Sequence, residues 1–299
     1  MSYAIGIDLG CTNIKGLAVT LAGNVLAEVS VATQEEAGRR VWSRNVRLAC
    51  EKLSKAVGHE PAVLGIAAPG LPARDQCSIA YMPGRLQGLQ GLVWRKFLEV
   101  EHPVPVLNDA QAALLGEAWL GAASDCRNAI LLTLGTGVGG AAMVDGHLLR
   151  GHIGRAGHLG HISLNPDAEV DVANTPGSLE SAIGDCTVQA RSGGRFPSTK
   201  ALLDAAQAGD RLAAEVWRRS VKSLAAGVAG LINVLDPEIV VIGGGIVRSG
   251  ETLLRPLRAH LKRFEWRPGG HKARVAAAKL GDRAGAFGAA WNALHHAID

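Results

Sequence analysis

The sequence is short of the features that would place the protein outside a reducing compartment or in a membrane. Its 299 residues include only five cysteines, an odd number at irregular spacing. An odd number of irregularly spaced cysteines argues against a disulfide scaffold, so we expect a cytoplasmic protein. No long apolar run occurs, and the chain enters a strand-like segment almost at once. We therefore expect no signal peptide, no membrane span and no membrane partner.

Aromatic residues and unbalanced charge are also scarce. Aromatics make up 4% of the chain, whereas glycine alone occurs 38 times, so small residues should let helices and strands pack unusually close. The 31 basic and 27 acidic residues leave a formal net charge of +4. No tract interleaves basic residues with aromatics, and the small basic clusters are better explained as solvated faces. We expect no nucleic-acid partner.

Apolar strand-like runs alternate with helical patterns, which is typical of an α/β fold. A helix is predicted over residues 40–57, a strand over 62–66 and a long helix over 210–235. A 47% hydrophobic content over this length supports a sizeable core. We expect a small N-terminal α/β domain over residues 1–108, completed by a C-terminal helix at 284–299, and a larger α/β domain over 109–283.

A first glycine loop follows the apolar run Tyr3–Ile7 and reads Asp8-x-Gly10-x-Thr12. A backbone that turns tightly at Gly10 aims N–H groups at an anion, the Thr12 hydroxyl can donate to a phosphate oxygen, and Lys15 adds positive charge. Asp8 would then face a magnesium ion or its waters. The alternative is an ordinary glycine hairpin.

A second glycine loop, residues 134–140, joins two further strand-like runs and reads as a hairpin of the same design. Its glycines let the main chain approach a charged ligand closely around Thr136. Two phosphate hairpins on different halves of one chain are less easily explained by chance than one.

Asn108-Asp109 follows an apolar strand and opens an alanine- and leucine-rich helix. The simplest role for Asp109 is to cap this helix by accepting a hydrogen bond from a first-turn amide. A carboxylate between two phosphate loops is also where a hydroxyl would lose its proton as it attacks a γ-phosphate. Both roles are compatible if one carboxylate oxygen stays free.

Together these motifs resemble the ROK family of sugar kinases and repressors, and especially its glucokinase and N-acetylmannosamine kinase branch. The resemblance rests on the ordered set Asp8-x-Gly10-x-Thr12-x-x-Lys15, Asn108-Asp109, 134–140, 156–161 and 241–245. It implies two ribonuclease-H-like domains of the actin and hexokinase type around a nucleotide cleft. It also implies ATP and Mg²⁺ as cofactors, a small-molecule sugar phosphorylated at a hexose hydroxyl (usually O6), and a homodimer.

The resemblance assigns roles residue by residue. Asp109 is the expected catalytic base. The expected sugar ligands are Asn108, Asp109, His158, His161 and Glu180. The residues expected to bind the nucleotide are Asp8, Gly10, Thr12, Lys15, Gly135, Thr136, Gly137, Gly243, Gly244 and Gly245. Asp8 is also expected to hold magnesium through water.

Two departures from the family pattern bear on specificity. His158 stands where the family has a glutamate, so a group that only accepts hydrogen bonds has become one that can both donate and accept. Its charge would depend on pH near neutrality if the imidazole were unperturbed. The family's zinc-binding cysteines are absent from residues 165–180, so we expect no structural zinc and assign His161 to the sugar.

An alternative metal site with oxygen and nitrogen ligands stays open. Its six candidate ligands would be His152, His158, His161, Asp167, Glu169 and Asp171. The segment lacks a tight pair of soft ligands, and acidic loops are more often solvated surface, so we favour a loop without metal.

Three questions of function stay open at this stage. The family includes repressors, but these carry an additional N-terminal DNA-binding domain, whereas this chain starts in the first phosphate strand. A non-catalytic sugar or polyol sensor, or a kinase for a non-glucose polyol, is the main alternative to a glucose kinase. The sugar itself and the choice between ATP and polyphosphate as donor are not fixed by the motifs.

Overall fold

The computed structural model describes residues 2–296. It folds into two compact units. Unit 1 contains the described parts of Met1–Asp125, Leu148–Ala156 and Lys279–Asp299, and unit 2 contains Cys126–His147 and Gly157–Ala278. The sequence placed a domain boundary after residue 108; the compact units instead keep the following helix with the N-terminal part, and the functional domain division stays a prediction.

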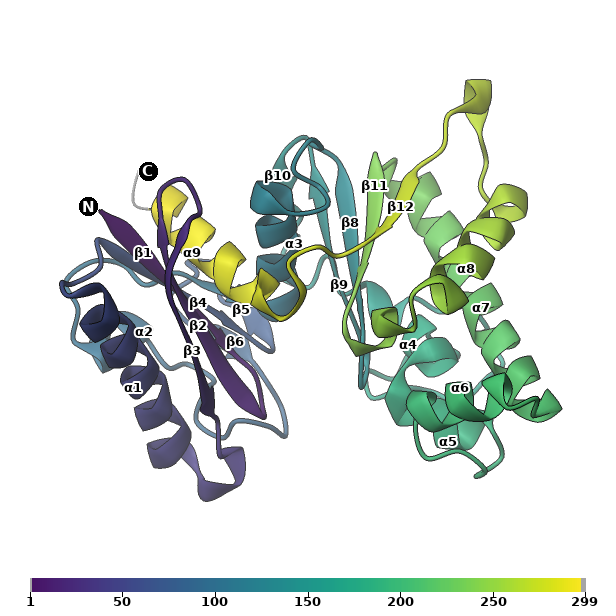
Figure 1. Cartoon of the computed structure of the whole chain (residues 1–299), viewed down its shortest axis with the longest axis horizontal. Helices are drawn as coiled ribbons and strands as arrows, with labels where there is room; N and C mark the ends of the chain where they lie inside the picture. The colour runs from purple at the N-terminus through teal and green to yellow at the C-terminus, as the bar shows by residue number, and fades with distance from the viewer. Residues whose placement is uncertain (1, 297–299) are drawn as a thin grey trace. The chain divides into compact units, whose positions relative to one another are not determined.

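Unit 1 is built on a five-stranded sheet whose strand order is β3-β2-β1-β4-β7 (Figure 1). β1 is antiparallel to β2 and parallel to β4, which is in turn parallel to β7. The strands are β1 (Tyr3–Leu9), β2 (Asn13–Thr20), β3 (Val25–Ala32), β4 (Val63–Ala68) and β7 (Val106–Asn108). A separate two-stranded sheet contains β5 (Leu71–Pro72) and β6 (Ile79–Tyr81).

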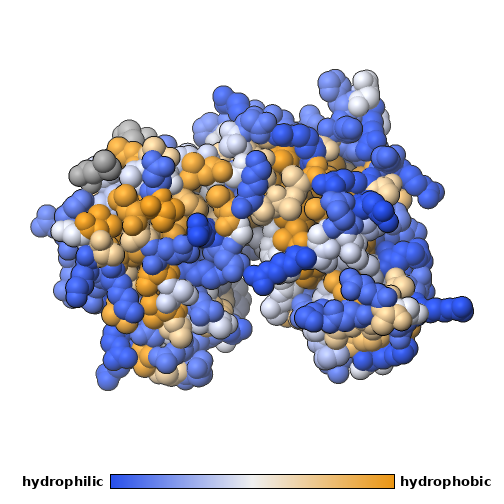
Figure 2. Space-filling view, viewed as in Figure 1, coloured by the Kyte–Doolittle hydropathy of each residue, from blue (hydrophilic) through white to orange (hydrophobic). Residues whose placement is uncertain are grey.

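Helices cover this sheet. They are α1 (Arg39–Val57), α2 (Trp94–Leu98), α3 (Asp109–Leu120) and α9 (Ala284–His296). β1 is buried almost throughout, and Trp42 of α1 and Trp94 of α2 are fully buried in the same core. β3 is the partly exposed edge strand, and Leu21, Val25 and Leu26 at and before its start are exposed. Figure 2 shows hydrophobic side chains gathered on the surface of the N-terminal part of the chain.

The last helix, α9, packs directly on β1, β4 and α3 of unit 1. Glycines make this contact possible: a Cβ added at Gly6 would lie 1.9 Å from the Ala286 carbonyl oxygen. A Cβ at Gly288 would lie 1.7 Å from the Ala112 carbonyl oxygen. The close packing expected from the glycine content therefore occurs here. The expected helix at 284–299 ends at His296 in the described chain, and its last three residues lie outside the described residues.

Unit 2 repeats the design with the strand order β10-β9-β8-β11-β12. β8 is antiparallel to β9 and parallel to β11, which pairs in parallel with β12. The strands are β8 (Ala129–Leu134), β9 (Val138–Val144), β10 (His147–Leu148), β11 (Ile239–Gly243) and β12 (Arg274–Ala277). The predicted α/β class with two ribonuclease-H-like sheets is confirmed.

Unit 2 contains five α-helices among the described residues, one of which was predicted from the sequence. They are α4 (Leu179–Ile183), α5 (Val188–Arg191), α6 (Thr199–Gln207), α7 (Arg211–Leu235) and α8 (Glu251–Phe264). The predicted helix over 210–235 is α7, which begins after Asp210 because the Asp210 carboxylate accepts a hydrogen bond from the Ala213 amide at 2.9 Å. Within residues 2–296, no helix combines the length and the apolar composition needed to cross a membrane.

Candidate active site

The first glycine loop is the tight turn between β1 and β2. The Gly10 amide donates to the Asn13 carbonyl at 3.1 Å, and a Cβ on Gly10 would lie 2.9 Å from that oxygen. Thr33, which follows β3 in the chain, holds the loop through two hydrogen bonds. Its hydroxyl donates to the Gly10 carbonyl at 2.6 Å, and its amide donates to the Thr12 carbonyl at 2.8 Å. The Thr12 residue itself is exposed. Hydrogen bonds thus hold the turn in place, and Thr12 stays accessible to solvent.

Asp8 ends β1 opposite Lys15 in the strand register. The pKa of Asp8 is raised to about 7, chiefly by burial and also by the nearby Asp109 and Asp282 carboxylates, while Lys15 opposes the rise. Lys15 itself forms an ion pair with Asp282, with Nζ and Oδ2 3.3 Å apart. Two carboxylates, Asp8 and Asp109, therefore repel one another in unit 1, and a divalent cation with a preference for oxygen ligands fits this donor set.

Asn108 and Asp109 divide the two roles that the sequence left open. Asn108 is the N-cap of α3: its Oδ1 accepts from the Ala110 amide at 2.9 Å, and its Nδ2 donates to the Gly70 carbonyl at 3.1 Å. Asp109 is exposed, and its Oδ1 also accepts from Ala110, at 2.8 Å. The other carboxylate oxygen has no partner among the described residues.

The surroundings of Asp109 suit a proton acceptor. Although the residue is accessible to solvent, the protein atoms around its carboxylate raise its pKa, and the Ala110 amide and the Asn108 side chain partly oppose this rise. A carboxylate with a raised pKa is a stronger base than an ordinary aspartate. The hydrogen bond from the Ala110 amide engages Oδ1 of Asp109, so helix capping does not account for both oxygens of this carboxylate.

Unit 2 contains a cavity of about 620 Å³, within the range typical of small-molecule sites. Gly135 and Thr136 of the second glycine loop and Gly245 after β11 all line it. The structure thus brings together two motifs separated by over a hundred residues. The remaining lining residues are Asp185, Ser198, Thr199, Lys200, Leu203, Asp204, Gln207, Ile246, Arg248, Ser249 and Thr252.

The other predicted glycines of unit 2 do not line this cavity, and their packing explains them. A Cβ on Gly137 would lie 2.2 Å from Glu180 Oε2. Gly244 has φ 82°, and a Cβ there would lie 2.3 Å from the Leu134 carbonyl oxygen. Gly243 is buried at the end of β11. These glycines allow close approach of protein atoms, whereas Gly135 and Gly245 have open space beside them.

Sequence reasoning missed Asp185 and Thr199. The Asp185 and Cys186 amides donate to the carbonyls of Gly135 and Thr136 at 3.0 and 2.8 Å, so they hold the glycine loop in place. The Asp185 carboxylate accepts from the Thr199 amide at 2.5 Å, and the buried Thr199 hydroxyl has no partner among the described residues. The only local signal was the helix start at Ser198, whose hydroxyl accepts from the Ala201 amide at 3.2 Å.

The predicted sugar ligands of unit 2 form one cluster. Glu180 Oε2 accepts from the Val138 amide at 2.9 Å. His161 Nδ1 lies 2.7 Å from Asp171 Oδ2. Burial lowers the pKa of His158, and neighbouring His161 lowers it further, so His158 is neutral at pH 7. A neutral imidazole offers a sugar hydroxyl one donor and one acceptor.

Only part of the alternative metal set comes together. Within residues 2–296, one grouping of possible ligands has its atoms within 4.8 Å of one another, and it consists of His161, Asp171 and Glu180. His152, His158, Asp167 and Glu169 do not join it. It contains no thiolate, and Asp171 already accepts from the Ala173 and Thr175 amides at 2.8 and 3.0 Å.

Elemental analysis is expected to find less than stoichiometric zinc in the purified protein. Both carboxylates among the three candidate ligands accept amide hydrogen bonds, and structural zinc sites normally have four ligands that are rich in cysteine. Inductively coupled plasma mass spectrometry after exhaustive dialysis measures this directly. One tightly held zinc per chain, lost together with folding on chelation, would establish a metal site at this cluster.

Asp171 is expected to stabilise unit 2 in a pH-dependent way. Burial alone would raise its pKa, but His161, the Thr175 and Ala173 amides and Ser178 lower it to about 2. Because the folded-state pKa lies below the ordinary value, the stabilisation is present above pH 4 and is lost as the pH falls towards 2. Asp171→Asn should cost about 2 kcal/mol at pH 7.

Urea denaturation at several pH values checks this expectation. The difference between the wild type and Asp171→Asn should shrink between pH 4 and pH 2. Asp167→Asn is the matched control, because Asp167 is exposed in the same loop. Equal effects of the two substitutions would show that Asp171 has no special role.

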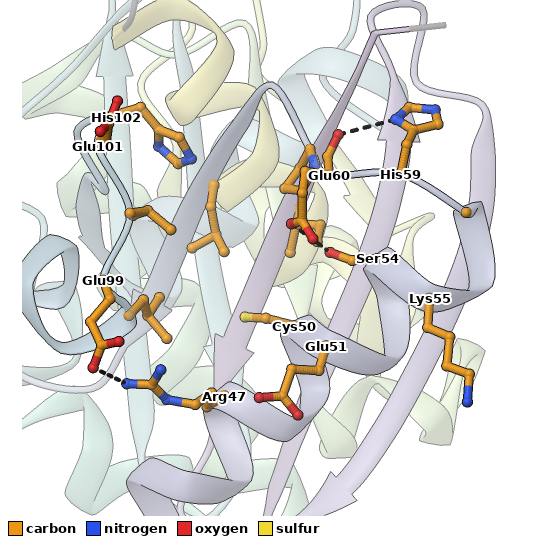
Figure 3. A pocket seen from close by; sticks show the side chains of 16 residues that line it. Arg47, Cys50, Glu51, Ser54, Lys55, His59, Glu60, Glu99, Glu101 and His102 are labelled. Atoms are coloured by element: carbon orange, nitrogen blue, oxygen red, sulfur yellow. Dashed lines mark hydrogen bonds and ion pairs between the residues drawn. The ribbon is translucent and has the colours of Figure 1, made fainter.

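The largest of the described cavities, about 950 Å³, lies elsewhere in unit 1 and contains none of the predicted site residues. Figure 3 shows that two of its carboxylates already have protein partners: Glu99 pairs with Arg47, and Glu60 accepts from the Ser54 hydroxyl. Four glutamates line it against one arginine and one lysine. This acidic lining disfavours a triphosphate, so size does not make this cavity the nucleotide site.

Comparison with known proteins agrees with the site motifs. The ROK family profile matches residues 4–296. A glucokinase of Halalkalibacterium halodurans is 32% identical over 320 residues, which cover 97% of this chain and 94% of that enzyme. The crystal structure of a ROK hexokinase from Thermus thermophilus has a TM-score of 0.88 at 30% identity and covers 99% of both chains. A ROK family glucokinase from Streptomyces griseus, solved with glucose and AMPPNP, has a TM-score of 0.80 at 29% identity and covers 98% of this chain and 100% of that one.

Proposed function

Because this chain belongs to the ROK family, we propose that it is a sugar kinase that transfers the γ-phosphoryl group of ATP to a hexose hydroxyl, O6 of glucose or a related sugar. The observation that carries this proposal is the Asp109 carboxylate. It has a raised pKa and one oxygen free of protein partners, although the neighbouring Asn108 already caps the helix. The glucokinase relatives and the Streptomyces griseus complex support the reaction class.

In the proposed reaction, Asp109 accepts the proton of the sugar hydroxyl as its oxygen attacks the γ-phosphorus. The bond from that phosphorus to the β,γ-bridging oxygen breaks, and ADP leaves with the electron pair. Asn108, His158, His161 and Glu180 are the proposed sugar ligands. His158 replaces a charged acceptor with a neutral imidazole, so the preferred hydroxyl pattern should differ from that of relatives with glutamate there.

The nucleotide is proposed to occupy the unit 2 cavity. Gly135 and Thr136 would present main-chain amides to the phosphates, and Gly245 would lie against the adenosine. The unpartnered Thr199 hydroxyl supplies a further hydrogen-bonding group. From unit 1, Gly10, Thr12 and Lys15 are proposed to face the phosphates. Magnesium bound at Asp8 through water would neutralise phosphate charge.

A panel of sugars and donors tests the proposal. ATP consumption is followed with glucose, mannose, allose, N-acetylmannosamine, fructose and inositol, and polyphosphate is tested as the alternative donor. Sustained ATP turnover provoked by at least one sugar is the expected result. Saturable sugar binding without turnover would instead support a non-catalytic sensor, for which the unusual His158 is the specific observation.

Two further proposals follow from the family and the cysteines. A homodimer is proposed from the family relationship, and light scattering of the purified chain measures it. None of the five cysteines, all of which lie among the described residues, forms a disulfide, which supports a cytoplasmic protein.

A further inference from the structure

A second, smaller cavity of unit 1 takes no part in the reaction proposed above. Its volume is about 220 Å³. Pro72 of β5, Gln111 of α3 and the segment from Arg150 to Gly154 line it, and Arg74 and Gln76 complete its polar wall. Gly154 allows the close contact, because a Cβ there would lie 2.9 Å from the Pro72 carbonyl oxygen. The site is therefore formed by three segments far apart in sequence.

Two buried glutamine side chains that line this cavity each have one amide atom without a protein partner. Gln111 is 2% exposed, and its Nε2 is unpaired, whereas its Oε1 accepts from the Asn108 amide at 3.4 Å. Gln76 is 7% exposed with an unpaired Oε1. The Gln76 backbone is fixed by hydrogen bonds to Ala73 and Val106 at 2.9 and 2.7 Å. A buried polar atom without a partner is destabilising, and a polar ligand that pairs with it would remove that cost.

The charge of the cavity wall is positive. Arg74 and Arg150 both line it, and neither guanidinium has an ion pair or hydrogen bond within residues 2–296. No acidic residue is part of the lining. The neighbouring Asp75 carboxylate instead accepts from the Cys77 amide at 3.0 Å. Surrounding protein atoms lower the pKa of Arg150 although the residue is exposed, so this cation is partly desolvated without a counter-ion.

We propose that this cavity binds the phosphate group of a small molecule. Two free guanidinium groups match a doubly charged oxyanion, because each can donate two parallel N–H bonds to it. Gln111 Nε2 adds a neutral donor, and Gln76 Oε1 can accept from a hydroxyl on the phosphate or on the rest of the ligand. The volume is below the roughly 300 Å³ of ordinary ligand pockets, so the ligand is smaller than a nucleotide.

The position of Arg150 gives such a ligand a structural consequence. Leu148–Ala156 belongs to unit 1, but the chain on both sides of it belongs to unit 2. A phosphate held by Arg74 and Arg150 would tie this connecting segment to the body of unit 1. Gln111 would also transmit binding to the Asn108 cap, because its Oε1 accepts from the Asn108 amide at 3.4 Å.

Equilibrium binding to the whole protein tests the site. Inorganic phosphate and glycerol phosphate are titrated at constant ionic strength, with acetate as the monovalent comparison. A saturating non-hydrolysable ATP analogue with Mg²⁺ is present throughout, so that the proposed nucleotide site is filled. Both phosphate compounds should bind with similar affinity and more tightly than acetate.

Variants that each remove one positive charge test whether phosphate binds at this cavity. R74Q and R150Q should each weaken phosphate binding by about tenfold, as expected for loss of a charged hydrogen-bonding partner. R95Q, which removes the same charge from an exposed position on α2, should leave it unchanged. Equal loss in all three variants, acetate binding as tight as phosphate, or no saturable phosphate binding would overturn the proposal. Because binding is measured rather than turnover, a negative sugar panel would leave this result standing.

Discussion

Asp109→Asn is expected to lower kcat by about two to four orders of magnitude, the usual contribution of a positioned general base. The asparagine keeps an oxygen that can accept from the Ala110 amide, and Asn108 still caps α3, so the fold of unit 1 should persist. The substitution removes the free carboxylate oxygen that would take the sugar proton. Affinity for ATP should change little, because the nucleotide is proposed to bind in the unit 2 cavity.

Steady-state kinetics and equilibrium nucleotide binding separate these effects. Asp167→Asn, an exposed change in unit 2 that also removes one carboxylate, should leave turnover at the wild-type level. Near-normal kcat in Asp109→Asn would reject this residue as the base. A parallel loss of ATP affinity and helix content would instead indicate that Asp109 acts through the structure of α3.

Gly288→Ala is expected to destabilise unit 1 by about 3 kcal/mol, the upper end of the usual cost of overpacking. The added Cβ would lie 1.7 Å from the Ala112 carbonyl oxygen, and both partners are helix backbone that cannot turn aside. α9 would have to move away from α3, and the same helix contacts β1 at Gly6 and β4 at Gly65. The local clash would therefore spread through the packing of the whole unit.

Gly230→Ala provides a matched control for Gly288→Ala. Gly230 lies in the exposed face of α7, and no atom lies within 4 Å of its added Cβ. Alanine there should stabilise the helix by up to about 1 kcal/mol. Denaturant unfolding of both variants, followed by circular dichroism, measures the contrast. Similar stability of Gly288→Ala and the wild type would show that α9 can shift at little cost.

Local features were predictable because neighbouring residues determine them. The turn at Gly10 depends on a strand, a glycine and a second strand within a short stretch, and the register Asp8 to Lys15 follows from that turn. The helix α7 combines an apolar stripe with an aspartate cap. The ordered motifs were sufficient to indicate the family, since each is a short segment whose chemistry depends on adjacent residues.

Long-range pairings could not be predicted, because no local pattern records which distant atom a side chain will meet. Glu117 reads as one polar residue in an apolar helix, yet it is fully buried and accepts hydrogen bonds from the amides of Ala122, Lys279 and Leu280 at 2.7, 3.0 and 2.8 Å. Thr199 lines the unit 2 cavity, where its amide donates to the carboxylate of Asp185. Such partners depend on packing across the unit.

The sequence by itself determined the class of fold, the two phosphate loops and the acidic residue proposed as base, because each depends on residues that are close together in the chain. Only the tertiary structure decided which glycines face open space and which face backbone. It also decided that Asn108 caps the helix while Asp109 keeps an oxygen free, and that Arg74, Gln76, Gln111 and Arg150 meet around one cavity. The reason is the same throughout: burial and unpaired hydrogen-bonding groups are properties of the packed unit, and they appear only when distant segments come into contact.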